Sequence, residues 1–184
     1  MNAVLDTTTG EMLEYCHLIK NPNQVIFKKA SANDLGKLAQ GVGTRMYRGI
    51  NTIFFINPSE MSKGKKSAYY KLVVSIRPLK EEKNRISVTI DRDRLEYEGN
   101  KLIVPATLTT IKIYLNSVVS TNEAGYIIAD IKDFYYRTPI ENCEYGYLPL
   151  ELIPEEIIQQ YNLTQLVIND KVYFEICKGM PGLK

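Results

Sequence analysis

The chain has 184 residues, of which 45% are hydrophobic and 24% charged, with a formal net charge of +2. This is enough apolar material for one packed domain or part of a larger one, and it excludes intrinsic disorder by composition. No apolar run of about 18 residues is present and the acidic N-terminus lacks the apolar core of a signal peptide, so we expect an intracellular protein of the cytoplasm or nucleus.

The first half of the sequence predicts strands around one short helix. Residues 3–15 predict two short extended pieces around a Thr-Gly turn, and Ser31–Val42 predicts a helix that Gly36 and Gly41 weaken. Three further strands are expected, at 50–57, 71–79 and 84–91. A basic loop at 61–70 precedes the second, and a polar turn joins the last two into a β-hairpin.

Positive charge is concentrated around this hairpin. From Lys63 to Arg94 there are ten Lys or Arg against four Asp or Glu, which leaves 13 basic and 17 acidic residues elsewhere. Such a distribution predicts a surface that faces phosphate. The alternative is a solvated edge hairpin whose lysines only discourage aggregation.

The second half begins with the clearest helix, Pro105–Ser120. Its apolar residues form a stripe that we expect to face a core: Leu108, Ile111, Leu115 and Val118. The apolar segment 125–131 predicts a short strand buried on both faces. A helix is expected at 153–161 and a hairpin at 166–176 that turns at Asn169-Asp170. Together the elements predict a mixed α+β fold.

Cysteine and histidine residues give no sign of a metal site. Cys16, Cys143 and Cys177 are odd in number and share no close spacing, which argues against a zinc knuckle or a disulfide framework and agrees with a reducing compartment. His17 has only Cys16 beside it, so we expect a surface or loop residue and not a ligand.

Asp130 ends the predicted buried strand, where a carboxylate needs a compensating cation. Magnesium is a candidate, because it takes one or two carboxylates, a carbonyl oxygen and substrate phosphates. The alternative is a structural role for Asp130, as a helix cap or as the partner of Lys132 or Arg137.

The segment YIIADIKDFYYRTPI at 126–140, with EYGYLPL behind it, resembles motif A of reverse transcriptases, especially those of copia-type LTR retrotransposons. Asp130 matches the first catalytic aspartate, and Tyr135 matches the aromatic residue five positions later. Lys83, Arg85 and the strand after them are similar to the basic fingers segment of that family. The helix at 105–120 and KGMPGLK at 178–184 also resemble family segments, so the resemblance covers about 27–184.

The resemblance implies a partial right-hand polymerase fold with fingers hairpins and part of the palm sheet with flanking helices. It divides one partial domain, 1–184, into an N-terminal extension at 1–26, a fingers-like part at 27–104 and the first half of the palm at 105–184. It also implies the activity of an RNA-directed DNA polymerase, a nucleotidyltransferase that takes an RNA or DNA template–primer and deoxynucleoside triphosphates.

Within motif A the resemblance assigns a role to each residue around the aspartate. Asp130 is expected to be catalytic and to bind Mg²⁺, with the backbone carbonyl of Ile131 available to the same ion. Asp133 and Phe134 are expected to lie along the triphosphate, where their main-chain N–H groups meet it. Tyr135 is expected to lie under the deoxyribose as a steric gate.

Outside that segment, Lys83 and Arg85 are expected to clamp the β and γ phosphates of the nucleotide. The side chains of Phe134 and Tyr136, on the other side of the turn from Tyr135, are expected in the core.

The sequence also departs from the family, since it has no Asp-Asp motif and ends before the glutamine expected after Gly-Leu. One of three carboxylates cannot hold two metal ions, so we expect an N-terminal fragment that is inactive alone and that self-associates through an uncovered palm edge. Two alternatives remain: a non-catalytic module that binds nucleic acid or protein, and an unrelated α+β domain.

Overall fold

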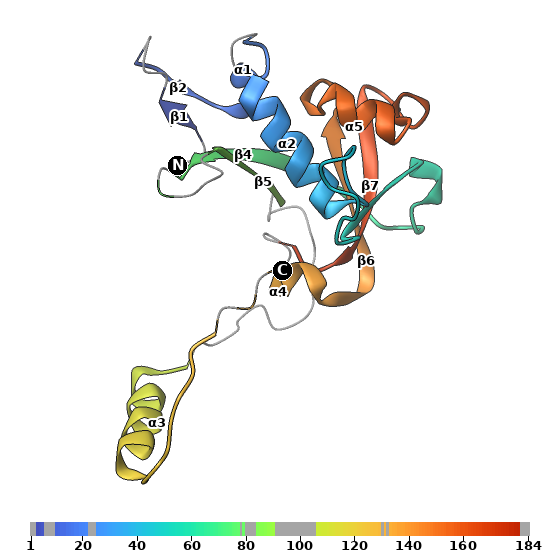
Figure 1. Cartoon of the computed structure of the whole chain (residues 1–184). Helices are drawn as coiled ribbons and strands as arrows, with labels where there is room; N and C mark the ends of the chain where they lie inside the picture. The colour runs from blue at the N-terminus through green and yellow to red at the C-terminus, as the bar shows by residue number, and fades with distance from the viewer. Residues whose placement is uncertain are drawn as a thin grey trace.

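The main body of the molecule is a five-stranded sheet with strand order β3-β7-β6-β4-β5 (Figure 1). A computed structural model describes residues 3–5, 10–21, 25–77, 79, 84–90, 106–129, 131 and 133–180. The strands are β3 (Ile53–Ile56), β4 (Ser67–Ile76), β5 (Asn84–Ile90), β6 (Pro139–Pro149) and β7 (Lys171–Lys178). Neighbouring strands are antiparallel except for β4 and β6, which run parallel. With its helices, this sheet confirms the predicted mixed α+β class.

The N-terminal part places a long helix on one face of the sheet. Two short strands, β1 (Val4–Leu5) and β2 (Met12–Leu13), pair antiparallel as expected, and α1 (Tyr15–Leu18) leads to α2 (Val25–Leu38). The predicted helix is confirmed, but it begins at Val25 and not at Ser31. Near the end of this helix the chain folds back on it, and only glycine fits at position 36. A Cβ atom there would lie 2.6 Å from the Cβ of Val42.

The core lies between α2 and the sheet. Alternate residues of β4, from Ala68 to Val74, are buried, as the period of two in a strand requires. The same alternation buries Phe174 of β7, whose ring lies 4.6 Å from that of Tyr70. The β4–β5 hairpin is confirmed, with Tyr70 to Ile76 opposite Ile90 to Asn84.

The strand β6 was not expected from the sequence, yet it lies between β7 and β4. It contains proline, asparagine and glycine, which are depleted in strands, so its two neighbours and not its own propensity determine its conformation. After it, α5 (Glu155–Gln160) follows Pro154, close to the predicted helix. Asn169 and Asp170, with φ of 52° and 59°, form the predicted tight turn into β7.

The segment 106–131 differs most from expectation. The helix α3 (Leu108–Ser120) is confirmed and capped by the Thr107 hydroxyl, which accepts from the N–H of Thr110 at 3.1 Å, but none of its residues is buried. Residues 125–129 form extended chain outside the sheet, and Ile127 is 88% exposed, so the predicted buried strand is wrong. Figure 1 shows this chain running back along α3, away from the sheet. An apolar run forms a buried strand only where neighbouring strands pair with it, and the described residues provide none here.

In the part of the chain that the structure describes, no helix combines the length and apolarity needed to cross a bilayer.

Candidate anion-binding pocket

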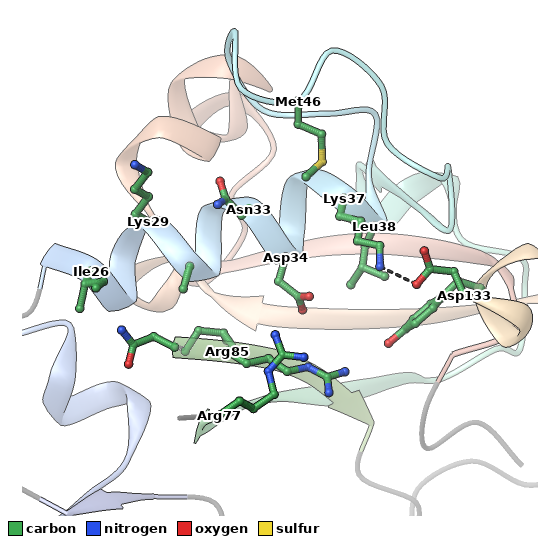
Figure 2. A pocket seen from close by; sticks show the side chains of 14 residues that line it. Ile26, Lys29, Asn33, Asp34, Lys37, Leu38, Met46, Arg77, Arg85 and Asp133 are labelled. Atoms are coloured by element: carbon green, nitrogen blue, oxygen red, sulfur yellow. Dashed lines mark hydrogen bonds and ion pairs between the residues drawn. The ribbon is translucent and has the colours of Figure 1, made fainter. Parts of the chain in front are cut away.

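A pocket of about 640 Å³ opens between α2, the β4–β5 hairpin and the segment that enters α4 (Phe134–Arg137). The chain reverses direction at the end of β4, so Arg77, just after β4, and Arg85, on β5, reach the same space. Figure 2 shows Asp34 pointing from α2 toward these two guanidinium groups, with Asp133 approaching from the side of α4. Three segments that are distant in sequence, namely α2, the β4–β5 hairpin and the segment around α4, therefore meet at one concave site.

The side chains that line this pocket carry an excess of positive charge. Four are cationic: Lys29, Lys37, Arg77 and Arg85. Two are carboxylates, Asp34 and Asp133, so the lining has two more positive than negative groups. The two lysines project from one face of α2 because residues four and eight apart are neighbours on a helix surface. Such a surface favours an anion with several charges.

One ion pair closes the side of the pocket next to α4. The Nζ atom of Lys37 lies 2.5 Å from Oδ1 of Asp133, and both side chains are partly buried. The same ammonium lies 5.6 Å from the centre of the Tyr136 ring. Asp133 has a left-handed backbone with φ of 59°, so the chain turns sharply here and brings its carboxylate back over α2. The pair thus fixes the segment that enters α4 against the long helix α2.

Asp34 is the most perturbed carboxylate in the pocket. Burial raises its pKa from 3.8 to about 6, and the negative charge of Asp133 adds to this rise. A hydrogen bond with the backbone of Val88 and the charges of Arg85 and Lys37 oppose it. A carboxyl group whose pKa is shifted by burial and by specific charges within a concave site is typical of a functional site.

Asp34→Asn is expected to stabilise the fold at neutral pH. The folded pKa lies above the unfolded one, so the contribution of Asp34 to stability is fully present below pH 3.8 and is lost as pH rises through about 6. The loss is about 2–3 kcal/mol, and asparagine, which cannot ionise, avoids it.

Urea denaturation at several pH values checks this expectation. The difference in unfolding free energy between Asp34→Asn and the wild type should grow from acid to neutral pH. Glu141→Gln, at an exposed position of β6, is the matched control and should change stability by less than about 0.5 kcal/mol. A difference for Asp34→Asn that does not vary with pH would show that its carboxylate is not desolvated.

Two residues that the resemblance assigned to nucleotide binding, Arg85 and Asp133, both line this pocket. Phe134 does not line it and is 53% exposed, so its expected place in the core is wrong, whereas Tyr136 packs partly buried against the core as expected. The N–H of Phe134 donates to the carbonyl of Ile131 at 3.2 Å. This turn engages the N–H of Phe134, which was expected to meet a triphosphate, and the carbonyl of Ile131, which was expected to bind a metal ion.

Three predicted site residues cannot be placed. Asp130 and Lys83 lie outside the described residues, and so does the side chain of Tyr135, although its backbone belongs to α4. The predicted Mg²⁺ site and steric gate therefore stay predictions.

Comparison with known proteins adds no assignment. No family model, no curated protein and no solved structure matches the chain. The role of the pocket therefore has to be inferred from its residues.

Lys29, Lys37 and Asp34 were missed as pocket residues. These residues, with Asn33 between them, form one polar face of α2. The helix predicted from the sequence began only at Ser31, so it did not include the whole of this face. Conversely, Lys65 of the predicted basic loop pairs with Glu144 at 2.7 Å and does not line the pocket.

A second cluster was also missed. The Sγ atoms of Cys143 and Cys177 lie 3.2 Å apart, and the carboxylate of Glu175 is beside them. Burial, and then contact with Cys143 and Glu175, raises the pKa of the Cys177 thiol to about 12. The two cysteines are far apart in sequence, so only the pairing of β6 with β7 reveals them.

Proposed function

We propose that this chain is the fingers and the first half of the palm of an RNA-directed DNA polymerase, inactive by itself, and that its pocket binds the phosphates of a nucleotide or of a template–primer. One observation carries the proposal. Arg85 of the fingers-like hairpin and Asp133 of the motif-A-like segment line the same pocket, although the resemblance was drawn from the two segments separately.

The chemistry of the pocket supports phosphate as the ligand. Guanidinium groups bind phosphate oxygens with two parallel hydrogen bonds, and two arginines line the site. A volume of about 640 Å³ lies within the usual range for small-molecule sites. Asp34 and Asp133 hold the surrounding cationic side chains in place by attraction between opposite charges. An entering phosphate would compete with these two carboxylates for the same cations.

No step is assigned to Mg²⁺. Asp130 lies outside the described residues, and Asp133 is already paired with Lys37. The pairing of Asp133 with Lys37 also fits a second candidate, a module that binds nucleic acid without catalysis. Both candidates use the pocket in the same way, so phosphate binding tests what they share.

The purified chain is expected to bind a primer–template duplex with a Kd of roughly 1–100 μM at physiological salt. If all four pocket cations contact phosphates, log affinity should fall against log salt with a slope of up to about −4. Arg85→Ala should reduce that slope by about one unit, because one phosphate contact is lost. Fluorescence anisotropy of a labelled duplex, titrated from low to physiological salt, measures both quantities.

Arg48→Ala is the matched control, since Arg48 is exposed and does not line the pocket. Its slope should equal that of the wild type, and a deoxynucleoside triphosphate should displace the duplex from both. Absence of binding at low salt, or equal losses for Arg48→Ala and Arg85→Ala, would refute a phosphate-binding pocket.

A further inference from the structure

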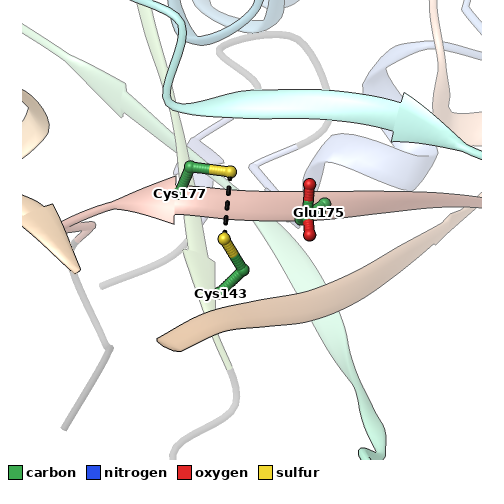
Figure 3. Close-up of side chains that lie close together, drawn as sticks. All are labelled: Cys143, Glu175 and Cys177. Carbon is green, nitrogen blue, oxygen red and sulfur yellow. Dashed lines mark hydrogen bonds between the residues drawn. The ribbon is translucent and has the colours of Figure 1, made fainter. Parts of the chain in front are cut away.

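The cluster of Cys143, Glu175 and Cys177 lies on the partly exposed face of β6 and β7 (Figure 3). Glu175 and Cys177 are two residues apart on β7, so both side chains project from the same face. Cys143 approaches from the neighbouring strand β6. One ligand atom from each residue lies within 4.8 Å of the other two.

In the part of the chain that the structure describes, no cationic side chain is paired with this cluster. Its three members are all acids, and no Lys or Arg among the described residues forms an ion pair with Glu175. The phenol of Tyr145 donates to Oε1 of Glu175 at 3.2 Å, which orients the carboxylate without neutralising it. Convergent acids with a hydrogen bond behind the carboxylate are typical of a metal site with its supporting shell.

We propose that Cys143, Cys177 and Glu175 bind a thiophilic divalent cation, Zn²⁺ being the probe of choice. Two thiolates favour a soft or borderline metal over Mg²⁺. Tetrahedral Zn²⁺ with Zn–S bonds of about 2.3 Å requires sulfur atoms roughly 3.8 Å apart. The observed 3.2 Å therefore needs only a small rotation of either side chain. All three residues are partly exposed, so water can complete the coordination, and the two thiol protons are released to solvent.

The position of this site gives the ion a structural role. The pairing of β6 with β7 is irregular between Pro139 and Glu144, and Cys143 lies within that interruption. A metal ion would link the two strands where the regular ladder is broken. The helix α4 and Asp133 directly precede this part of β6, so the ion would also restrain one side of the pocket.

The test is a titration of the reduced full-length chain with Zn²⁺, followed by competition with a metal indicator. We expect one ion per chain with a Kd below about 1 μM. Cd²⁺, as a spectroscopic substitute, should produce thiolate-to-metal charge-transfer absorption. Cys143→Ser and Cys177→Ser should each weaken Zn²⁺ binding at least about 100-fold and remove that absorption, because a hydroxyl is a poor ligand for these metals.

Two further variants separate ligands from bystanders. Cys16→Ser should bind Zn²⁺ as the wild type does, since Cys16 lies outside the cluster. Glu175→Gln keeps an acceptor for Tyr145 but loses the charged ligand, and should weaken binding at least about tenfold while retaining the Cd²⁺ absorption. The proposal fails if the reduced chain binds no Zn²⁺, if Cys16→Ser loses binding to the same extent, or if Cys143 and Cys177 are found only as a disulfide.

Discussion

Gly146→Ala is expected to lower the free energy of unfolding by about 3 kcal/mol. An added Cβ atom would lie 2.1 Å from Cε2 of Tyr70 and 2.9 Å from Cε2 of Phe174. Both rings are fully buried and pack edge to face, so neither can move aside without opening the core between α2 and the sheet. Because β6 lies between β4 and β7, a displaced Gly146 would disturb both pairings.

Chemical denaturation followed by circular dichroism measures this effect. Gly125→Ala is the matched control, because nothing lies within 4 Å of a Cβ atom there, and it should change stability by less than about 0.5 kcal/mol. Combining Gly146→Ala with Tyr70→Leu removes the clashing ring and should recover part of the loss. Equal stability of Gly146→Ala and the wild type would mean that β6 does not pack against Tyr70.

Local patterns in the sequence predicted those elements whose conformation depends on nearby residues. Two strand segments joined by a polar turn predicted the β4–β5 hairpin, and Asn169-Asp170 predicted the turn into β7. The pairing of β6 with two partners could not be predicted, because Gly146 belongs to a strand only through its pairing with Ala68 of β4 and Phe174 of β7. Propensity describes a residue in isolation, whereas this strand depends on its neighbours.

The candidate sites show the same division. Arg85 and Asp133 were assigned to one nucleotide site by resemblance, and both line the pocket. Lys37 was not predicted there, because its position depends on how α2 lies over the hairpin. Cys143 and Cys177 could not be paired from spacing, since their contact follows from the alignment of β6 with β7. A site built by long-range strand pairing leaves no local sequence signal.

The purified chain is expected to self-associate through α3 and the extended segment after it. Apolar side chains dominate this part of the molecule, and Ile127 and Ile128 are 88% and 87% exposed. Contiguous apolar surface of this kind favours association, and a second copy of the chain is the partner present in a purified sample. In the proposed polymerase, the rest of the palm would cover the same surface.

The double variant Ile127→Lys and Ile128→Lys tests this surface, because nothing in the described fold packs on these two side chains. Burying one isoleucine contributes about 1.5–3 kcal/mol, so placing charge at both positions should weaken dimerisation about 100-fold or more. Tyr47→Lys, at a loop position that is 82% exposed, is the matched control and should associate as the wild type does. Sedimentation velocity over a range of concentrations measures the change. A wild-type chain that stays monomeric at high concentration would show that this surface is not adhesive, and would favour a complete domain over a partial palm.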